Sequence, residues 1–563
     1  MITDASAIPR DTCLKADVCI VGSGAAGVPL ALALAGRGLS ILLLEAGFPR
    51  DDKRTQALYE GEVVDERLHS PADKFRLRRF GGATAIWGGR CMPFDPIDFE
   101  PRPYLPHSGW PISYADLAPY FPLANAISEA GDFEYNADTV FDPVAQAMFK
   151  GFSSETVRTD SLERFSCPTD FGARYERRLR LAKDIQVVMG ANVTSIDLSA
   201  DGSTVQRLKV ASLAGNRFSA EAGRVVLAVG GIETARLLLA SNDVRKAGIG
   251  NENDLVGRHY MCHIAGNVGA LTINGPTTNV RHGYEVSPEG IYCRRRLCLT
   301  AEEQRRLGVG NMVARLHFPR IADPAHRNGV LSGLFMAKNF ISYEYGKRLN
   351  DGKKPGVGTY ARHVYNILTD PWDTTAFAYN WLTKRTLAER KFPSVILRNK
   401  TNRFSLEVHS EQFPNPASRV SLCAERDELG VPKVRIDWRY LPADIASVRK
   451  TLEAFAAEFA RSGIGRYEFD SETLEEDLTR FGAYGGHHIG TARMGDDPTT
   501  SVVDRNCRLH SVNNLFIASS AVFPTSSQAN PTLTITALAL RLAEHLAASL
   551  GAAQPKPAHS LIA

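Results

Sequence analysis

The feature that most constrains the fold is a glycine-rich turn between an apolar strand and an Ala/Leu-rich helix near the start of the chain. Residues 18–21 form a short, mainly β-branched run, glycines follow at once, and the helical segment ends at residues 36–38, Gly-Arg-Gly. A second apolar strand closes at Glu45. Strand, helix and strand within about 30 residues make a βαβ unit, the commonest building block of parallel sheets. An α/β fold is therefore predicted for this part of the chain.

The turn has the spacing Gly-x-Gly-x-x-Gly at Gly22, Gly24 and Gly27. Such glycines make a tight turn, admit a pyrophosphate close to the backbone and let the helix pack on the strand. Glu45 follows Gly24 by 21 residues, where a carboxylate accepts hydrogen bonds from both ribose hydroxyls of an adenosine. A dinucleotide site is predicted, and the motif by itself leaves FAD and NAD open.

Two later stretches look like parts of the same domain. Residues 224–231 form an apolar strand that leads into a Gly-Gly turn, and residues 514–550 hold a strand, a Ser- and Pro-rich loop and a long helix. Residues 403–438 differ, because they alternate apolar and polar side chains between turns, which is typical of an antiparallel sheet. The chain has 563 residues, about twice what one core usually supports, so two domains are predicted.

The composition excludes several classes of protein. Lys and Arg number 66 against 62 Asp and Glu, without clustered basic runs, so nucleic acid is not an expected partner. Nine scattered cysteines without a CxxC pair predict no metal centre and reduced thiols, which favours a cytoplasmic location. The first residues lack a signal-peptide pattern, and no run of about 18 uncharged apolar residues predicts a membrane span.

A second glycine-dense loop and two late motifs resemble the glucose-methanol-choline (GMC) family of flavin oxidoreductases over nearly the whole chain. The order and spacing of the matching pieces are specific to that family. They are the turn at residues 22–27, Glu45-Ala46-Gly47, Gly81-Gly82, Gly230-Gly231, HHIGTARMG at residues 487–495 and NPTLT at residues 530–534.

This resemblance implies FAD as the cofactor and a Rossmann-like α/β FAD-binding domain interleaved with an α+β substrate-binding domain built on an antiparallel sheet. FAD-binding segments are expected at residues 1–130, 186–270 and 486–550, substrate-binding segments at residues 131–185 and 271–485, and a flexible tail at residues 551–563. The residues expected to contact FAD are Gly22, Gly24, Ala25, Ala26, Gly27, Glu45, Ala46, Gly81, Gly82, Thr84, Trp87, Gly88, Gly89, Val193, Ala228, Gly230, Ala518, Asn530 and Thr532.

The resemblance also bears on how FAD is attached. Some relatives link FAD covalently through a histidine four residues after the second glycine of the Gly81-Gly82 type of loop. This sequence has Ile86 there, followed by the matching Trp87. Non-covalent FAD is therefore expected.

For catalysis the resemblance points to His487, the first residue of an HxxGT pattern. Oxidation of an alcohol by hydride transfer requires removal of the hydroxyl proton, and a neutral imidazole suits that task near neutral pH. Asn530 has no proton affinity, so it is expected to hydrogen-bond the substrate oxygen and hold the alcohol in register. His488 is the alternative base, and the sequence does not decide which of the two histidines faces the flavin.

Three further residues are given roles by the resemblance. His409 and Gln412 lie on a predicted strand of the sheet that roofs the substrate pocket in the family, so both are expected to hydrogen-bond hydroxyls of a sugar or polyol. His263 follows a segment that in the family lies near the adenine half of FAD.

The predicted function is FAD-dependent oxidation of a hydroxyl group of a sugar, polyol or glycoside, with O2 or a quinone as the electron acceptor. Two alternatives stay open, a lyase of the hydroxynitrile type and the catalytic subunit of a cytochrome-coupled dehydrogenase. A nicotinamide-dependent dehydrogenase leaves the His-His and Asn-Pro motifs unexplained. The oligomeric state stays open.

Overall fold

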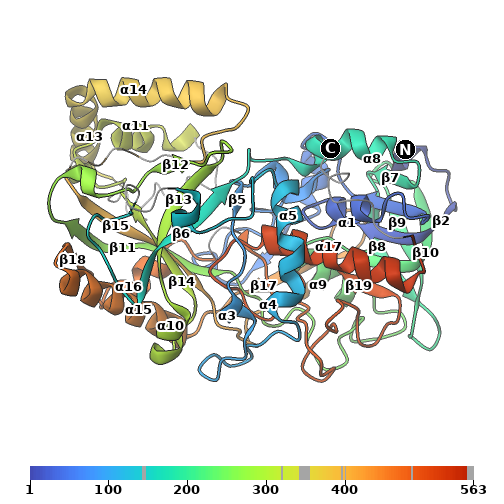
Figure 1. The fold of residues 1–563 in the computed structure, drawn as a ribbon. Coiled ribbons are helices and arrows are strands. Elements are labelled where there is room, and N and C mark those ends of the chain that lie inside the picture. The colour runs from blue at the N-terminus through green and yellow to red at the C-terminus, as the bar shows by residue number, and fades with distance from the viewer. Residues whose placement is uncertain are drawn as a thin grey trace.

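The computed structural model describes residues 1–141, 147–318, 321–340, 355–394, 397, 399, 401–483 and 486–553, so most of the predicted tail at residues 551–563 lies outside the described residues. Two lobes lie side by side (Figure 1). The right-hand lobe in that view holds the N-terminal βαβ unit, and the left-hand lobe is built on a large antiparallel sheet. The predicted combination of an α/β domain with an α+β domain is confirmed.

The first lobe contains an eight-stranded, mostly parallel sheet. Its strands in spatial order are β1 (Ile2–Asp4), β7 (Ile185–Met189), β3 (Ile41–Glu45), β2 (Cys13–Val21), β10 (Arg217–Leu227), β9 (Val205–Ala211) and β8 (Asn192–Leu198), with β19 (Leu515–Ile517) beside β10. Only the β10–β9 and β9–β8 pairs are antiparallel. The helices of this lobe are α1 (Gly27–Leu34), α8 (Phe171–Leu181), α9 (Gly231–Ala240) and α17 (Thr532–Ser549).

Helix α1 is buried along its whole length between the sheet and α17. Its approach to the sheet depends on Gly27, because a Cβ atom at that position would lie 1.8 Å from the carbonyl oxygen of Gly22. Gly22 itself has a φ of +99°, which favours glycine. The first glycine turn therefore fixes where the helix begins and how closely it lies on β2.

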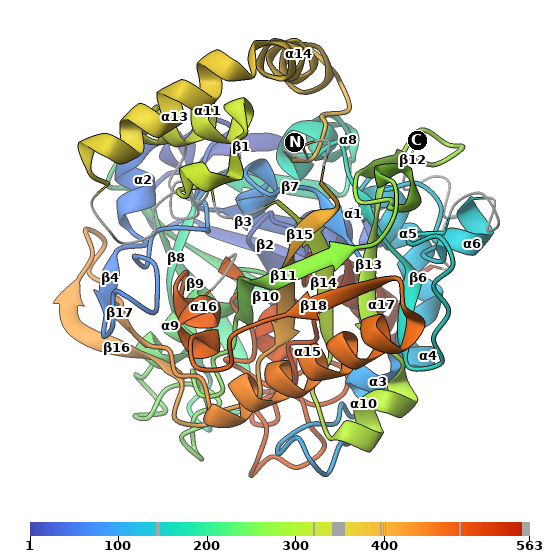
Figure 2. The same ribbon diagram turned by 90° about the vertical axis from the view of Figure 1, so that its left-hand side faces the viewer.

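The second lobe is built on a sheet whose strands all pair antiparallel. Their spatial order is β18 (Gly465–Glu468), β11 (His263–Ile273), β15 (Arg403–Glu411), β14 (Met312–His317), β13 (Tyr292–Leu299), β6 (Val157–Phe165) and β5 (Arg90–Cys91), with β12 (Tyr284–Val286) beside β13. Helices α15 (Pro442–Ser462) and α16 (Leu474–Thr479) contact β18 and β11. Figure 2 shows α15 crossing in front of the sheet and α13 (Val357–Thr369) above it.

The remaining helices are short or peripheral. They are α2 (Lys53–Ala57), α3 (Pro96–Phe99), α4 (Tyr114–Leu117), α5 (Phe121–Ile127), α6 (Ala137–Val140), α10 (Ala301–Leu307), α11 (Gly329–Met336) and α14 (Pro371–Trp381). No helix among the described residues is both long and apolar enough to cross a membrane.

Two strand assignments differ from the sequence prediction. Strand β11 belongs to the second sheet from His263 onward, although residues up to 270 were assigned to FAD binding. The sequence predicts one sheet for residues 403–438, but of its strands only β15 joins the large antiparallel sheet. Strands β16 (Arg419–Arg426) and β17 (Pro432–Asp437) form a separate three-stranded sheet with β4 (Gly61–Val63).

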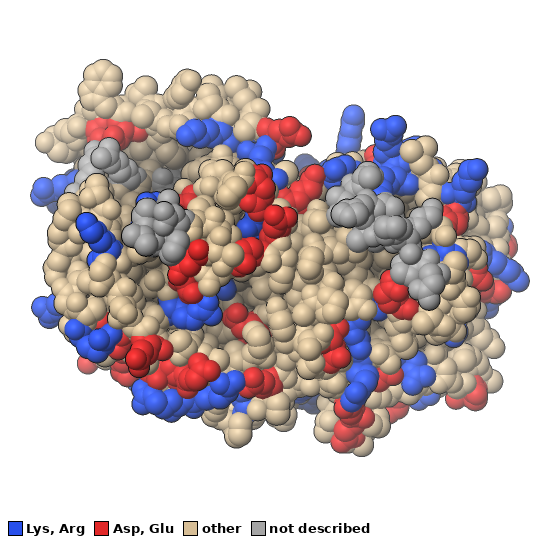
Figure 3. Space-filling view, viewed as in Figure 1, with Lys and Arg blue, Asp and Glu red and all other residues tan. Residues whose placement is uncertain are grey.

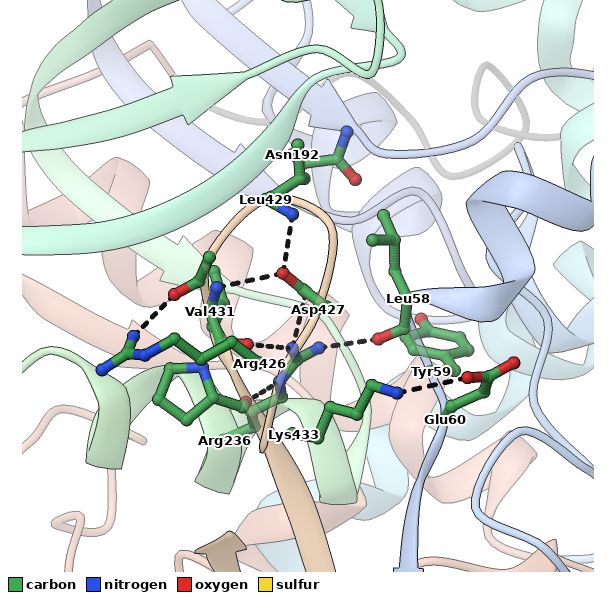
Figure 4. A network of polar contacts seen from close by, with 12 residues as sticks. Leu58, Tyr59, Glu60, Asn192, Arg236, Arg426, Asp427, Leu429, Val431 and Lys433 are labelled. Atoms are coloured by element: carbon green, nitrogen blue, oxygen red, sulfur yellow. Dashed lines mark hydrogen bonds and ion pairs between the residues drawn. The ribbon is translucent and has the colours of Figure 1, made fainter. Parts of the chain in front are cut away.

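A buried arginine explains why the β16–β17 hairpin leaves the large sheet. Arg236 on α9 forms an ion pair with Asp427 at 2.6 Å, with both side chains almost fully buried. It also donates to the carbonyl oxygens of Pro432 at 2.7 Å and Leu58 at 2.8 Å (Figure 4). A buried guanidinium needs all of these acceptors, so the hairpin is bound to the first lobe.

The segment that leads into α17 is held between the two lobes. We call residues 523–530 the closing loop. Trp110 packs on Phe523 with ring centroids 5.0 Å apart and donates to Thr525 Oγ1 at 2.9 Å. Ser527 Oγ donates to the buried Asp98 carboxylate at 2.6 Å. These contacts fix the backbone immediately before Asn530.

Candidate active site

One cavity joins the two glycine loops to the His-His and Asn-Pro motifs, and its volume is about 590 Å³. The predicted residues that line it are Gly22, Gly24, Ala25, Ala26, Glu45, Ala46, Gly82, Thr84, Trp87, Gly88, Val193, Ala228, Gly230, His487, His488, Ala518, Asn530 and Thr532. Gly27, Gly81 and Gly89 do not line it and instead shape the backbone behind its wall.

At one end the cavity is bounded by the first glycine turn. The Glu45 carboxylate accepts from Ser23 N at 2.9 Å, Ser23 Oγ at 2.6 Å and Gly47 N at 2.7 Å. Burial raises the pKa of Glu45, and these hydrogen bonds oppose that shift. A Cβ atom on Gly24 would meet only the Gly81 carbonyl oxygen, at 4.0 Å, so the space beside the turn is open. This is the close backbone approach that a pyrophosphate requires.

The second glycine loop packs against the first. Gly81 has a φ of +92°, and a Cβ atom there would lie 2.6 Å from Gly172 N. A Cβ atom on Gly82 would lie 3.2 Å from the Cα atom of Gly24. A larger residue at Gly82 would press on the first glycine turn, and one at Gly81 would clash with the start of α8.

At the other end of the cavity, His487 and Asn530 meet. The distance from His487 Nε2 to Asn530 Nδ2 is 3.1 Å. Because an amide NH2 group only donates, Nε2 is the acceptor and the ring hydrogen of His487 sits on Nδ1. Asn530 Oδ1 is buried and has no hydrogen-bond partner among the described residues. The two side chains assigned to catalysis from the sequence thus lie within hydrogen-bond distance of each other.

His263 contacts His487 from outside the cavity, which it does not itself line. His487 Nδ1 lies 2.8 Å from His263 Nδ1, and the His263 ring stacks on His409 with centroids 4.2 Å apart. The family resemblance implies a position near the adenine half of FAD for His263. Its contacts place it beside His487 and His409 instead. The sequence signal was only a histidine that opens an apolar strand, and its neighbour could not be identified without the pairing of β11 with β15.

His409 and Gln412 do not line the cavity, contrary to the expectation that they bind substrate. Both are buried and hold the closing loop. His409 Nδ1 donates to the Gln528 carbonyl oxygen at 2.6 Å, and the backbone N–H of Gln412 donates to Ser526 Oγ at 2.9 Å. The Gln412 side chain is occupied by Cys262 N at 2.8 Å and Trp438 Nε1 at 2.9 Å. Strand β15 therefore positions the site without facing into it.

His488 belongs to a different set of contacts. Its Nδ1 lies 2.7 Å from the hydroxyl of Tyr260, which in turn lies 2.8 Å from His69 Nε2. His488 Nε2 is buried, without a hydrogen-bond partner among the residues described. His488 lines the cavity, but its ring is held by Tyr260 while Asn530 contacts His487.

Burial keeps these imidazoles neutral. It lowers the pKa of His487, His488 and His409 well below 6.5, and that of His263 to about 3. Positive charge on His263 would lower the pKa of His487 further. A buried neutral imidazole has a free lone pair at one nitrogen, which is the requirement for a general base.

Two groups of side chains offer the ligand types of a metal site, with ligand atoms within 4.8 Å of one another: His263, His409 and His487, and His69, Cys262 and His488. In the first group, His487 Nδ1 and His263 Nδ1 lie 2.8 Å apart and are joined by a hydrogen bond. In the second, the Tyr260 hydroxyl bridges both histidines. Hydrogen bonding accounts for both groups.

Comparison with known proteins places these motifs in context. A family model for FAD dependent oxidoreductases matches residues 17–331, and a model for GMC oxidoreductases matches residues 414–539. Paromamine 6'-oxidase of Streptomyces fradiae is 25% identical over 95% of this chain and 92% of its own length. The fructose dehydrogenase large subunit of Gluconobacter japonicus is 23% identical over 94% and 97%. The crystal structure of pyridoxine 4-oxidase from Mesorbium loti shares the fold, with a TM-score of 0.55, 18% identity and coverage of 94% and 98%.

The first family model spans more than half of the chain, and the second includes both His487 and Asn530. The cavity and its two glycine loops are of the kind that such a family requires. The chain belongs to the FAD-dependent oxidoreductases, and its residues 414–539 match the GMC oxidoreductases.

Proposed function

We propose that this protein oxidises a hydroxyl group of a carbohydrate or glycoside to a carbonyl, with His487 as the general base. The observation that carries the proposal is the 3.1 Å contact between His487 and Asn530 at the far end of a cavity that begins at a dinucleotide-type glycine turn. The relatives named for paromamine and fructose support a carbohydrate substrate.

The donor set of the cavity fits FAD. The glycine turn and Glu45 would hold the adenosine and pyrophosphate half, and the residues from Gly82 to Gly88 and from Ala518 to Thr532 would bound the flavin half. When bound, FAD supplies the two-electron acceptor for the hydride that leaves the alcohol carbon. Ile86 lines the cavity where covalent relatives have a histidine, which supports non-covalent attachment.

The proton is the part of the reaction that the chain itself handles. The substrate hydroxyl donates to His487 Nε2, and the proton moves to that nitrogen as the carbon–oxygen double bond forms. His263 Nδ1 accepts from His487 Nδ1 and so fixes the tautomer whose lone pair lies on Nε2, the nitrogen at which the substrate hydroxyl replaces the contact with Asn530 Nδ2. Asn530 donates to the substrate oxygen and holds it in register.

The walls near His487 suit a polyhydroxylated substrate. Trp87, Phe165 and Tyr284 provide aromatic surface, and Arg90 adds a cationic donor. The Tyr284 hydroxyl is buried and has no hydrogen-bond partner among the described residues, so it offers both a donor and an acceptor to a substrate hydroxyl. Aromatic surface with a few fixed polar groups is typical of small-molecule sites.

The substrate class is tested by anaerobic flavin reduction. Sugars, glycosides, polyols and simple alcohols are mixed with the holoenzyme and the loss of the long-wavelength flavin absorbance is followed. Sugars or glycosides should bleach the flavin fastest, and reoxidation by O2 and by a benzoquinone should then identify the acceptor. A flavin that no alcohol bleaches would contradict the proposed oxidation and favour the lyase alternative.

His487→Ala should slow flavin reduction by about a hundredfold or more, the scale of lost general-base help, while FAD content stays unchanged. Stopped-flow reduction measures the effect. The matched control is His282→Ala, because His282 lies outside the cavity and bonds the Leu397 carbonyl oxygen. Normal reduction by the His487 variant would move the role of base to His488.

Reduction by the wild type should be independent of pH above 6.5 and fall only in acid, because the pKa of buried His487 lies well below that value. His263→Leu removes the acceptor for His487 Nδ1–H, a contact that favours the protonated ring, so the rate should fall and the acid limb should move to lower pH. His263→Asn keeps an acceptor for Nδ1 and should restore much of the rate. Identical pH profiles for all three proteins would exclude the positioning role of His263.

Non-covalent attachment predicts that acid precipitation releases all of the flavin. The supernatant should carry the yellow colour and the protein pellet should be white. An Ile86→His variant serves as the comparison, since it introduces the linking residue type at that position. Colour retained in the wild-type pellet would refute the interpretation of Ile86.

A further inference from the structure

An outer helical layer covers one side of the second lobe. It consists of α11, α13 and α14, which lie together along the upper edge of that lobe (Figures 1 and 2). Most of the large apolar side chains that are exposed among the described residues lie in these helices or in the segments directly flanking them, including Phe340, Val357, Tyr365, Leu368, Trp372 and Tyr379. Exposed apolar patches of this kind mark interaction surfaces.

Helix α13 has its polar and apolar sides reversed. His363 and Asn366 face inward and are buried, where His363 Nδ1 lies 3.0 Å from Ser332 Oγ and Asn366 Nδ2 donates to the same oxygen at 3.2 Å. Val357, Val364 and Leu368 are spaced so that they share one helix face, and all three are exposed. A surface helix in water normally has the opposite arrangement, so the outward face of α13 is suited to an apolar environment.

Helix α14 also exposes large apolar side chains. None of its residues is buried. Trp372 and Tyr379, seven residues apart, share one face, and Trp372 is 85% exposed. Packing against the rest of the chain therefore leaves the aromatic side of α14 uncovered.

The two helices point in different directions (Figures 1 and 2). In Figure 1 α14 runs across the view along the upper edge, and after the 90° turn of Figure 2 it is α13 that runs along the upper edge while α14 is seen nearly end-on. Two helices that point in different directions cannot both enter a single groove of a partner, but both can contact a broad surface.

The excess of positive charge in the layer favours binding to an anionic surface. Lys338, Arg362, Lys384 and Arg385 outnumber Asp370 and Asp373 between residues 329 and 387 of the described chain. The Lys338 ammonium lies 4.3 Å from the Phe335 ring centroid, and the Arg385 guanidinium lies 4.9 Å from that of Trp381. Figure 3 shows the upper edge of this lobe largely free of charge, with both blue and red groups beneath it. Cations beside Trp and Tyr are typical of helices that lie in the membrane interface.

We propose that the outer helical layer binds the surface of an anionic lipid bilayer, with α13 and α14 lying in the headgroup region. The contact is peripheral, since the helices lie along the surface and do not cross it. The apolar face supplies hydrophobic burial, and the flanking Lys and Arg side chains supply attraction to the lipid phosphates.

The proposal is tested by co-sedimentation of the full-length holoprotein with vesicles of phosphatidylcholine alone and of phosphatidylcholine mixed with phosphatidylglycerol. The wild type should bind the mixed vesicles more strongly, and added salt should weaken that binding. The double variant Leu368→Glu/Trp372→Glu should reduce the partition coefficient by at least about tenfold, because each substitution places a carboxylate in the interface. Unchanged flavin content shows that the variant is folded.

The matched control is Leu181→Glu, since Leu181 is a 67% exposed apolar residue on α8, in the other lobe. It should bind vesicles as the wild type does. Failure of the wild type to bind the mixed vesicles, or an equal loss in the control, would overturn the proposal. Light scattering is measured in parallel, and a dimer that the double variant dissociates would assign this face to a second copy of the chain instead.

Discussion

The site depends on how the closing loop is held between the two lobes. Residues 523–530 form no helix or strand, yet their backbone sets the position of Asn530 at the end of the loop. Buried side chains from both sides fix them, with Asp98 and Trp110 on one side and His409 and Gln412 on the other. Buried hydrogen bonds of this kind are costly to leave unmade, so the loop has one favoured position. The 3.1 Å contact between Asn530 and His487 follows from it.

A second constraint is the exclusion of water around the imidazoles. His263, His409 and His487 are packed ring against ring at 4.2–5.7 Å. Burial keeps all three neutral, and hydrogen bonding then decides which nitrogen of each ring carries the proton. The chain thus combines two effects that a base needs, an available lone pair and a fixed direction for it.

The sequence predicted local features well and long-range ones poorly. The glycine turn, β3 ending at Glu45 and the helix after Pro531 are local patterns, and the structure has each of them. The roles of His409 and Gln412 depended on what covers the polar face of β15. That strand alternates apolar and polar residues but is buried on both faces, so the alternation did not show that its polar face packs on the closing loop. The position of His263 was predicted wrongly for a different reason: its partner His487 lies 224 residues away in sequence. Predicting the separate β16–β17 sheet would have required knowing the partner of the buried Arg236. No sequence pattern indicates that this partner is Asp427.

The order of the chain has a consequence for biosynthesis. Strand β19, the closing loop and α17 are translated long after α1, yet α17 covers that otherwise buried helix. Until residues 515–549 have been translated, the apolar side of α1 lacks its cover and the cavity lacks one wall. The cavity is therefore completed only after these residues have been made, and until then α1 must be shielded from water by other means.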